Sequence, residues 1–214
     1  MLKIASFTFN AFQENTYILS SDSKFAVIID PGCYTKEEES ELESYIEQHS
    51  LTPLAVLNTH AHIDHILGNQ FCVSRFNLPL YLHKEDFKTL TMVESYTHVY
   101  GFENYKVSPS PTHELFDGMT LVFEDIKLSV HHTPGHCPGH VVFYNHENNF
   151  VINGDVLFQG SFGRTDLPGG DLDTLKKSIF TTLFNFPDHT VVYCGHGPQT
   201  TIGSEKLTNY IHQF

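Results

Sequence analysis

Short runs rich in β-branched and aromatic residues recur along the chain and predict strands that are buried on at least one face. Between two of them, Asp117-Gly118 is a two-residue turn signal that predicts a hairpin. The predicted strands are 3–9, 15–19, 25–29, 54–57, 80–82, 113–116, 120–123, 126–131, 141–144, 150–152 and 190–193.

Apolar residues spaced three and four apart predict helices between these strands. Such spacing marks residues 36–49 and a helix that presents Leu172, Leu175, Ile179 and Leu183 to the core. A further helix is predicted from just after residue 65 to about residue 76. A last helix should bury Leu207, Tyr210, Ile211 and Phe214, with Ser204 as its N-cap. Strand runs separated by helices favour sheets covered by helices, in a layered α/β or α+β fold.

The polar and aromatic segment 84–103 is only partly helical in pattern. Its continuation at 96–105 fits equally a lid over a site or a hydrophobic helix packed on the fold. The sequence does not separate these two readings.

Composition places the chain among globular proteins and limits the classes of partner that it is expected to bind. The 214 residues fit one domain, 1–214, and no apolar run approaches the roughly 20 residues of a membrane span. Without a secretory signal, we expect a cytoplasmic protein whose four cysteines are free thiols. The net charge of −13 argues against nucleic acid as a partner. The sequence does not determine the oligomeric state and is compatible with a monomer.

Histidine is the unusual component of this composition, with 15 residues, several of them clustered. The segment Thr59-His60-Ala61-His62-Ile63-Asp64-His65 follows a predicted buried strand. In extended backbone His60 and His62 share one face, and Asp64 and His65 follow where the chain must turn. Four potential ligands within six residues can serve two adjacent metal ions.

Three further candidates each follow a predicted strand. They are His136 in a Pro- and Gly-containing loop, Asp155 in Asn153-Gly154-Asp155, and His196 in Gly195-His196-Gly197-Pro198. Each is weak alone, because a histidine at a strand end is more often a hydrogen-bonded surface residue. Together with the first cluster they can complete a metal-binding site.

The combined pattern H-x-H-x-D-H followed by distant His, Asp and His resembles the metallo-β-lactamase superfamily. This resemblance implies an αββα sandwich, with two mixed β-sheets flanked by helices and metals at one edge. It also implies that His60, His62 and His136 hold one metal, that Asp64, His65 and His196 hold a second, and that Asp155 bridges both. The resemblance implies two divalent ions, zinc with iron or manganese as alternatives, which would supply a bridging hydroxide at neutral pH.

Within the superfamily the chain is most similar to short glyoxalase-II-like enzymes. The likeness lies in residues 154–158, 163–171 and 195–198. It implies hydrolysis of a small thioester of the hydroxyacylglutathione type, with Asp64 orienting the hydroxide and Arg164 binding an anionic part of the substrate. The thioesterase chemistry transfers better than glutathione specificity, because only 18 residues follow His196, too few for the C-terminal helical domain of full-length glyoxalase II.

Several alternatives stay open at this point. A persulfide dioxygenase with one iron shares the first cluster and the segment Gly163-Arg164-Thr165-Asp166. A nuclease is disfavoured by the acidic charge, a metal-stabilised binding protein by the full ligand set, and a true β-lactamase by Asp155 at the bridging position. Three further histidines flank a ligand loop and fit either partners that orient the ligands or simple strand or loop positions, which the sequence favours (His131, His132, His140). Cys137 and Cys194 are interpreted as buried or partly buried thiols.

Overall fold

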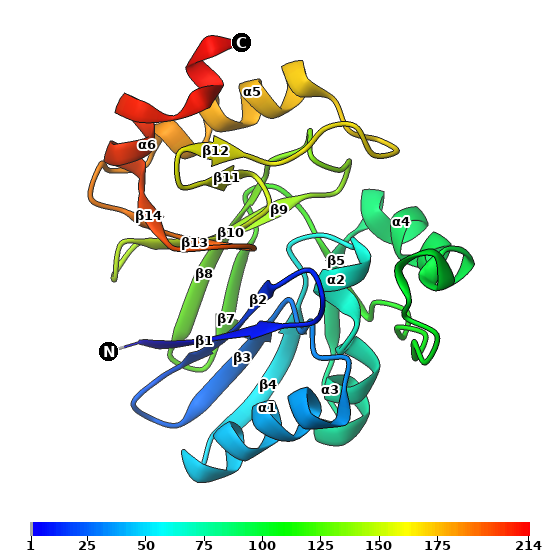
Figure 1. Ribbon diagram of the computed structural model, residues 1–214. Helices are drawn as coiled ribbons and strands as arrows, with labels where there is room; N and C mark the ends of the chain where they lie inside the picture. Colours follow the sequence, from blue (N-terminus) through cyan, green and yellow to red (C-terminus); the bar gives the residue numbers. More distant parts are fainter. Residues whose placement is uncertain (1) are drawn as a thin grey trace.

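Two six-stranded mixed sheets pack face to face in the computed structural model, which describes residues 2–214 (Figure 1). The first sheet has the strand order β1-β2-β3-β4-β5-β6 and the second has the order β14-β13-β10-β9-β8-β7. The strands of the first sheet are β1 (Lys3–Phe9), β2 (Glu14–Ser20), β3 (Phe25–Ile29), β4 (Thr52–Leu57), β5 (Leu80–His83) and β6 (His113–Leu115). Those of the second are β7 (Thr120–Phe123), β8 (Ile126–His132), β9 (Val141–Asn145), β10 (Phe150–Gly154), β13 (Val191–Cys194) and β14 (Thr200–Thr201).

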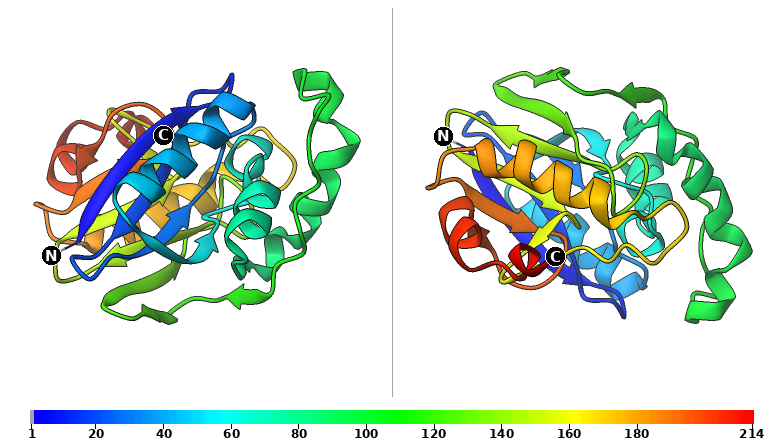
Figure 2. Two further views of the ribbon diagram at one scale, coloured as in Figure 1. Left: turned by 90° about the horizontal axis from the view of Figure 1, so that it is seen from below. Right: turned by 90° about the horizontal axis from the view of Figure 1, so that it is seen from above.

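Helices cover the outer face of each sheet, so the predicted αββα sandwich is confirmed (Figures 1 and 2). On the first sheet lie α1 (Lys36–Gln48) and α3 (Asn69–Phe76), and on the second lie α5 (Leu172–Thr181) and α6 (Ile202–Thr208). Successive side chains of a strand point to opposite faces of the sheet, so one set packs between the two sheets and the other packs beneath the helices. Leu19, Val27 and Leu57 face the second sheet, whereas their neighbours Ile18, Ile28 and Val56 face α1 and α3.

The remaining elements are short. They are α2 (Ile63–Ile66), η1 (Lys84–Asp86), α4 (Phe87–Met92), η2 (Val93–Ser95), η3 (Thr97–Tyr100), the ribbon of β11 (Leu157–Phe158) and β12 (Ser161–Phe162), η4 (Leu183–Asn185) and η5 (Tyr210–Gln213). None of the helices among residues 2–214 is long and apolar enough to cross a membrane. All four cysteines are free thiols, as predicted, and all four are buried.

Two predictions about local structure are wrong. Residues Asp117-Gly118 do not close a hairpin, because β6 pairs with β5 in the first sheet and β7 pairs with β8 in the second. The turn therefore carries the chain from one sheet to the other. Its Asp117 carboxylate accepts a hydrogen bond from the backbone N–H of His132 at 2.9 Å, which ties the turn to β8.

The last helix also differs from its prediction. Thr201, not Ser204, is the N-cap of α6, and its side chain accepts from the backbone N–H of Ser204. The chain then breaks at Asn209 into η5. Because of this break only Ile211 of the four predicted core residues is buried, and Leu207 is 84% exposed.

Segment 84–103 forms η1, α4, η2 and η3, of which the last three lie beside the sandwich in the two views of Figure 2. Val93 and Phe102 are buried there against Ile63 and Ile66, with Tyr96 and Tyr105 packed around them. The segment therefore packs against the edge of the sandwich near α2, and its role as a lid stays a prediction.

Candidate metal centre

The predicted ligands come from both sheets and meet at one edge of the sandwich. His60 and His62 follow β4, and Asp64 and His65 lie in α2. From the second sheet, His136 lies between β8 and β9, Asp155 follows β10, and His196 follows β13. All seven side chains predicted from the sequence are thus brought to the same place.

These side chains form two groups. Ligand atoms of His60, His62 and His136 lie within 4.8 Å of one another, as do those of Asp64, His65 and His196. In the first group His62 Nδ1 lies 2.8 Å from His136 Nε2. In the second group Asp64 Oδ2 lies 3.1 Å from His196 Nε2 and 3.6 Å from His65 Nε2.

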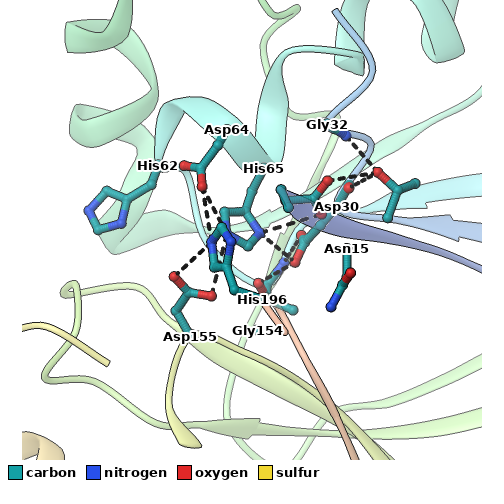
Figure 3. A network of polar contacts seen from close by, with 12 residues as sticks. Asn15, Asp30, Gly32, His62, Asp64, His65, Gly154, Asp155 and His196 are labelled. Carbon is teal, nitrogen blue, oxygen red and sulfur yellow. Dashed lines mark hydrogen bonds and ion pairs between the residues drawn. The ribbon is translucent and has the colours of Figure 1, made fainter. Parts of the chain in front are cut away.

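Asp155 lies between the two groups, and Figure 3 shows it converging with Asp64, His65 and His196. Its Oδ2 is 3.6 Å from His136 Nε2 and 3.5 Å from His196 Nε2, and its Oδ1 is 3.5 Å from His65 Nε2. One carboxylate therefore reaches histidines of both groups, as a bridging ligand requires.

The predicted ligands fit divalent ions, because three of their buried atoms have no hydrogen-bond partner among the described residues. Within the described chain, His60 Nε2, His65 Nε2 and Asp155 Oδ1 are buried atoms without a hydrogen-bond partner. Buried polar atoms are costly to leave unpaired, and these three all belong to predicted ligands. A metal ion is the partner that nitrogen and carboxylate oxygen atoms can share at this spacing.

In four of these histidines, Nδ1 points away from the centre and contacts a polar atom of the protein. This contact orients the other ring nitrogen, Nε2, toward the centre. His60 Nδ1 lies 3.0 Å from the Thr59 hydroxyl, and His65 Nδ1 lies 3.2 Å from Asp30 Oδ2. His136 Nδ1 lies 2.8 Å from the carbonyl oxygen of Arg164. His196 Nδ1 lies 3.1 Å from the carbonyl oxygen of Phe12.

Protonation differs between the two groups. Burial and the neighbouring His136 lower the pKa of His62 to about 3, and burial together with His65 lowers the pKa of His60. For His196 burial opposes the charge, but hydrogen bonds with Asp155 and Asp64 outweigh it and raise the pKa to about 10. The pKa of His65 is raised against burial by Asp64 and Asp155.

Asp86 is a buried carboxylate that the sequence analysis missed. It accepts hydrogen bonds from the backbone N–H of Ala61 and of Gly139, both at 2.8 Å, and from Cys137 Sγ at 3.2 Å. Ala61 separates two ligands of the first group, and Cys137 adjoins the third. Asp86 thus joins the two loops that carry the first group, and Cys137 is a hydrogen-bond donor to it.

Asp30 has the corresponding place behind the second group. Its carboxylate accepts from the Thr59 N–H at 2.7 Å and the Thr59 hydroxyl at 2.6 Å, and it faces the outer nitrogen of His65. Ligand atoms of Asp30 also lie close to His60 and His65, but this contact at Nδ1 of His65 makes Asp30 a support for that ring.

His140 takes the less favoured of the two roles considered for the histidines near the motifs. It is fully buried, and its Nε2 accepts a hydrogen bond from the backbone N–H of Asp155 at 3.0 Å. The preceding residue, Gly154, has φ of +52°, and a Cβ there would collide with His140 and Thr59. His140 therefore positions the backbone of the bridging ligand, whereas His131 is a strand residue near Phe186.

Arg164 is placed by its backbone more firmly than by its side chain. Its carbonyl oxygen faces His136, while its guanidinium forms two hydrogen bonds of 2.7 Å with the Asp166 carboxylate. The side chains of this pair are 60% and 67% exposed. The predicted capture of a substrate anion stays a prediction, and Asp166 is the competing partner.

Tyr96 adds an aromatic residue near the centre that no motif indicated. Burial, followed by the effects of Tyr100 and Asp64, raises the pKa of its phenol to about 12. The phenol is therefore neutral at physiological pH and lies within electrostatic range of a predicted ligand. Its only sequence signal is its place in an aromatic segment.

Known proteins resemble this chain over nearly its whole length. The chain is 39% identical over 198 residues to "Probable metallo-hydrolase YqgX" of Bacillus subtilis, covering 92% of this chain and 91% of that protein. It is 36% identical over 200 residues to "Hydroxyacylglutathione hydrolase GloC" of Haemophilus influenzae, covering 93% and 92%.

Solved structures agree with these relatives. The BLEG-1 B3 metallo-beta-lactamase superimposes with a TM-score of 0.89 at 38% identity, covering 98% of both chains. TTHA1623 in a di-iron-bound form superimposes with a TM-score of 0.86 at 38% identity, covering 96% of this chain and 98% of that one. The family model described as the metallo-beta-lactamase superfamily matches residues 9–196. The chain therefore belongs to the metallo-beta-lactamase superfamily and is a metal-dependent hydrolase.

Proposed function

We propose that this protein hydrolyses thioesters of the hydroxyacylglutathione type at a centre of two divalent ions. The observation that carries the proposal is the position of Asp155, whose carboxylate contacts His136 of the first group and His65 and His196 of the second. A shared carboxylate supports two adjacent ions and not one. Similarity to the hydroxyacylglutathione hydrolase GloC supports the choice of substrate.

Divalent ions in such a site lower the pKa of bound water to about 7 and polarise a carbonyl oxygen. The protein supplies orientation. Asp64 is buried, and although burial favours its neutral form, His65 and His196 lower its pKa, so it is an ionised hydrogen-bond acceptor at neutral pH. We expect Asp64 to hold the proton of the attacking water toward itself while it serves as a ligand.

A thioester suits this site because its leaving group needs little help. A thiol has a pKa near 8.5 and departs as the thiolate, whereas an amide nitrogen must be protonated. Tyr96, a phenol within electrostatic range of Asp64, is neutral, with a pKa of about 12. A phenol of that pKa is a hydrogen-bond donor and a poor source of a full proton, which again favours the thioester.

Two alternatives make different demands on the same residues. A persulfide dioxygenase with one iron would need two histidines and one aspartate, leaving the contact between His196 and Asp64 without a function in metal binding. Hydrolysis of β-lactams is favoured by one observation, the similarity to BLEG-1. The amide nitrogen of a β-lactam, however, makes a poorer leaving group than a thiol.

The test combines metal analysis with a substrate panel. Protein purified without chelator is analysed for zinc, iron and manganese, and then assayed on lactoylglutathione, an acyl thioester with a neutral thiol, a β-lactam and a persulfide with oxygen uptake. The proposal expects about two equivalents of metal and thioester turnover well above β-lactam turnover. His113→Gln is the control, since this histidine stacks on Tyr81 away from the centre. One equivalent of iron with persulfide-dependent oxygen uptake and no thioester turnover would overturn the proposal.

A further inference from the structure

Another cluster of potential metal ligands lies outside the centre. It consists of His83, the last residue of β5, Glu85 in η1, and His132, the last residue of β8. Because β5 belongs to the first sheet and β8 to the second, the cluster spans the two sheets. None of its members contributes to the two groups described above.

The three side chains are close enough for one ion. One ligand atom from each lies within 4.8 Å of the others. The two imidazole rings stack with centroids 4.2 Å apart and planes 15° apart, and Glu85 Oε2 is 4.0 Å from His132 Nε2. Ligand atoms around zinc lie about 2.0–2.3 Å from the ion, hence up to about 4 Å from one another. Because the lone pairs of stacked rings point in nearly parallel directions, the two rings must tilt toward each other to bind one ion.

The hydrogen bonds indicate which nitrogens are available. His132 Nε2 donates to the carbonyl oxygen of Pro138 at 2.8 Å, so its Nδ1 keeps a lone pair. The exposed Glu85 carboxylate, which lies 4.0 Å from Nε2, must turn to reach an ion bound at Nδ1. Donation to a backbone carbonyl is the usual support of a metal-binding histidine. His83 is only 5% exposed, and its Nδ1 receives only a long contact of 3.4 Å from the Glu85 N–H. The buried Nδ1 of His83 therefore lacks a good hydrogen-bond donor, and such atoms are costly in a protein interior.

We propose that His83, Glu85 and His132 form a third site, for a divalent ion of the zinc type, with water completing the coordination. Glu85 is half-exposed, which gives an ion and its waters access from solvent. The bound ion cross-links the ends of β5 and β8. It also anchors the chain directly before Asp86 and before the loop that carries His136, so its occupancy supports the first group of the centre.

The experiment adds zinc to protein that already holds its full complement of metal at the centre. Calorimetric titration and elemental analysis after dialysis measure a further equivalent, and thermal unfolding measures its effect on Tm. Glu85→Gln is the primary variant, because this residue is exposed and tolerates the change. The matched control is Glu94→Gln, an exposed glutamate in η2. His132→Gln is the second variant.

The proposal expects wild type and Glu94→Gln to bind one further zinc ion with a rise in Tm, because an ion that binds only the folded state stabilises it. Glu85→Gln should weaken this step by more than about tenfold, and His132→Gln should abolish it while the metals of the centre remain. Failure of wild type to take up a further equivalent in excess zinc overturns the proposal. So does unchanged affinity in Glu85→Gln. Neither result depends on thioesterase activity.

Discussion

The two ligand groups of the centre lie side by side but differ in chemistry. The first is made of three imidazoles, and burial keeps His60 and His62 neutral in the absence of metal. The second contains a carboxylate, and its histidines hold protons through contacts with Asp64 and Asp155. An ion therefore enters the first group without displacing protons from those two rings, whereas in the second it competes with protons. The buried supports differ as well, with Asp86 behind one group and Asp30 behind the other.

Removal of the shared ligand should have the largest effect, because it affects both groups. Asp155→Ala should lose metal from both and lower kcat/KM by at least about a hundredfold, given that loss of a supporting residue alone costs tenfold or more. Elemental analysis and thioester kinetics measure the two effects. His62→Ala and His196→Ala are the controls, each removing a ligand of one group. If Asp155→Ala kept two equivalents of metal, the bridging position would be refuted.

Asp64 tests whether the carboxylate of the second group does more than bind metal. Asp64→Asn keeps the shape of the side chain but removes the charge that orients the attacking water. We expect kcat to fall by more than about tenfold. Full metal content together with full turnover in this variant would contradict the orienting role.

The seven ligands could be predicted from the sequence because they lie in short motifs that directly follow predicted strands. The resemblance carried by those motifs supplied the two sheets and their covering helices. Asp86 could not be found, because its role depends on contacts across a long sequence separation, such as that with Gly139. For His140 the sequence leaves two roles open, and only the contact with the backbone of Asp155 decides between them. The false hairpin at Asp117-Gly118 has a related cause, since a turn signal does not say which sheet each flanking strand joins.

Asp86 and Asp30 allow the two groups to be weakened unequally. Asp86→Asn replaces one acceptor oxygen with a donor that faces the N–H groups of Ala61 or Gly139, so the first group should lose affinity by about tenfold. Asp30→Asn should act mainly on the second group through His65, with a smaller effect on the first group through Thr59 and His60. Stepwise metal titration of each variant measures the two affinities, with circular dichroism as a check on folding. Equal loss at both steps in both variants would show that the groups are not supported independently.

Proton release on metal binding distinguishes the groups directly. His196 has a raised pKa of about 10, so its proton stabilises the metal-free fold below the ordinary value of 6.5, and that contribution is lost as pH rises through about 10. An ion bound to the second group at pH 7 must displace this proton, and affinity should rise with pH by about tenfold per unit for each proton displaced. Calorimetry in buffers of different ionisation enthalpy counts the protons. If wild type and His196→Gln released the same number of protons on metal binding, the proposed difference in protonation between the two groups would be contradicted.

The smallest expected effect concerns Arg164, whose backbone supports the first group while its side chain is exposed. If the guanidinium binds an anionic part of the substrate, it must leave Asp166 to do so, and an exposed ion pair is weak. The loss in kcat/KM for Arg164→Ala should therefore be about two- to fivefold, appear in KM, and be confined to a thioester with an anionic thiol portion. Asp166→Asn releases the guanidinium and should lower KM for that substrate. Lys177→Ala, which removes an exposed cation of α5, controls for net charge. Equal loss on anionic and neutral thioesters with a lower Tm would instead mean that the Arg164–Asp166 pair only shapes the loop whose carbonyl holds His136.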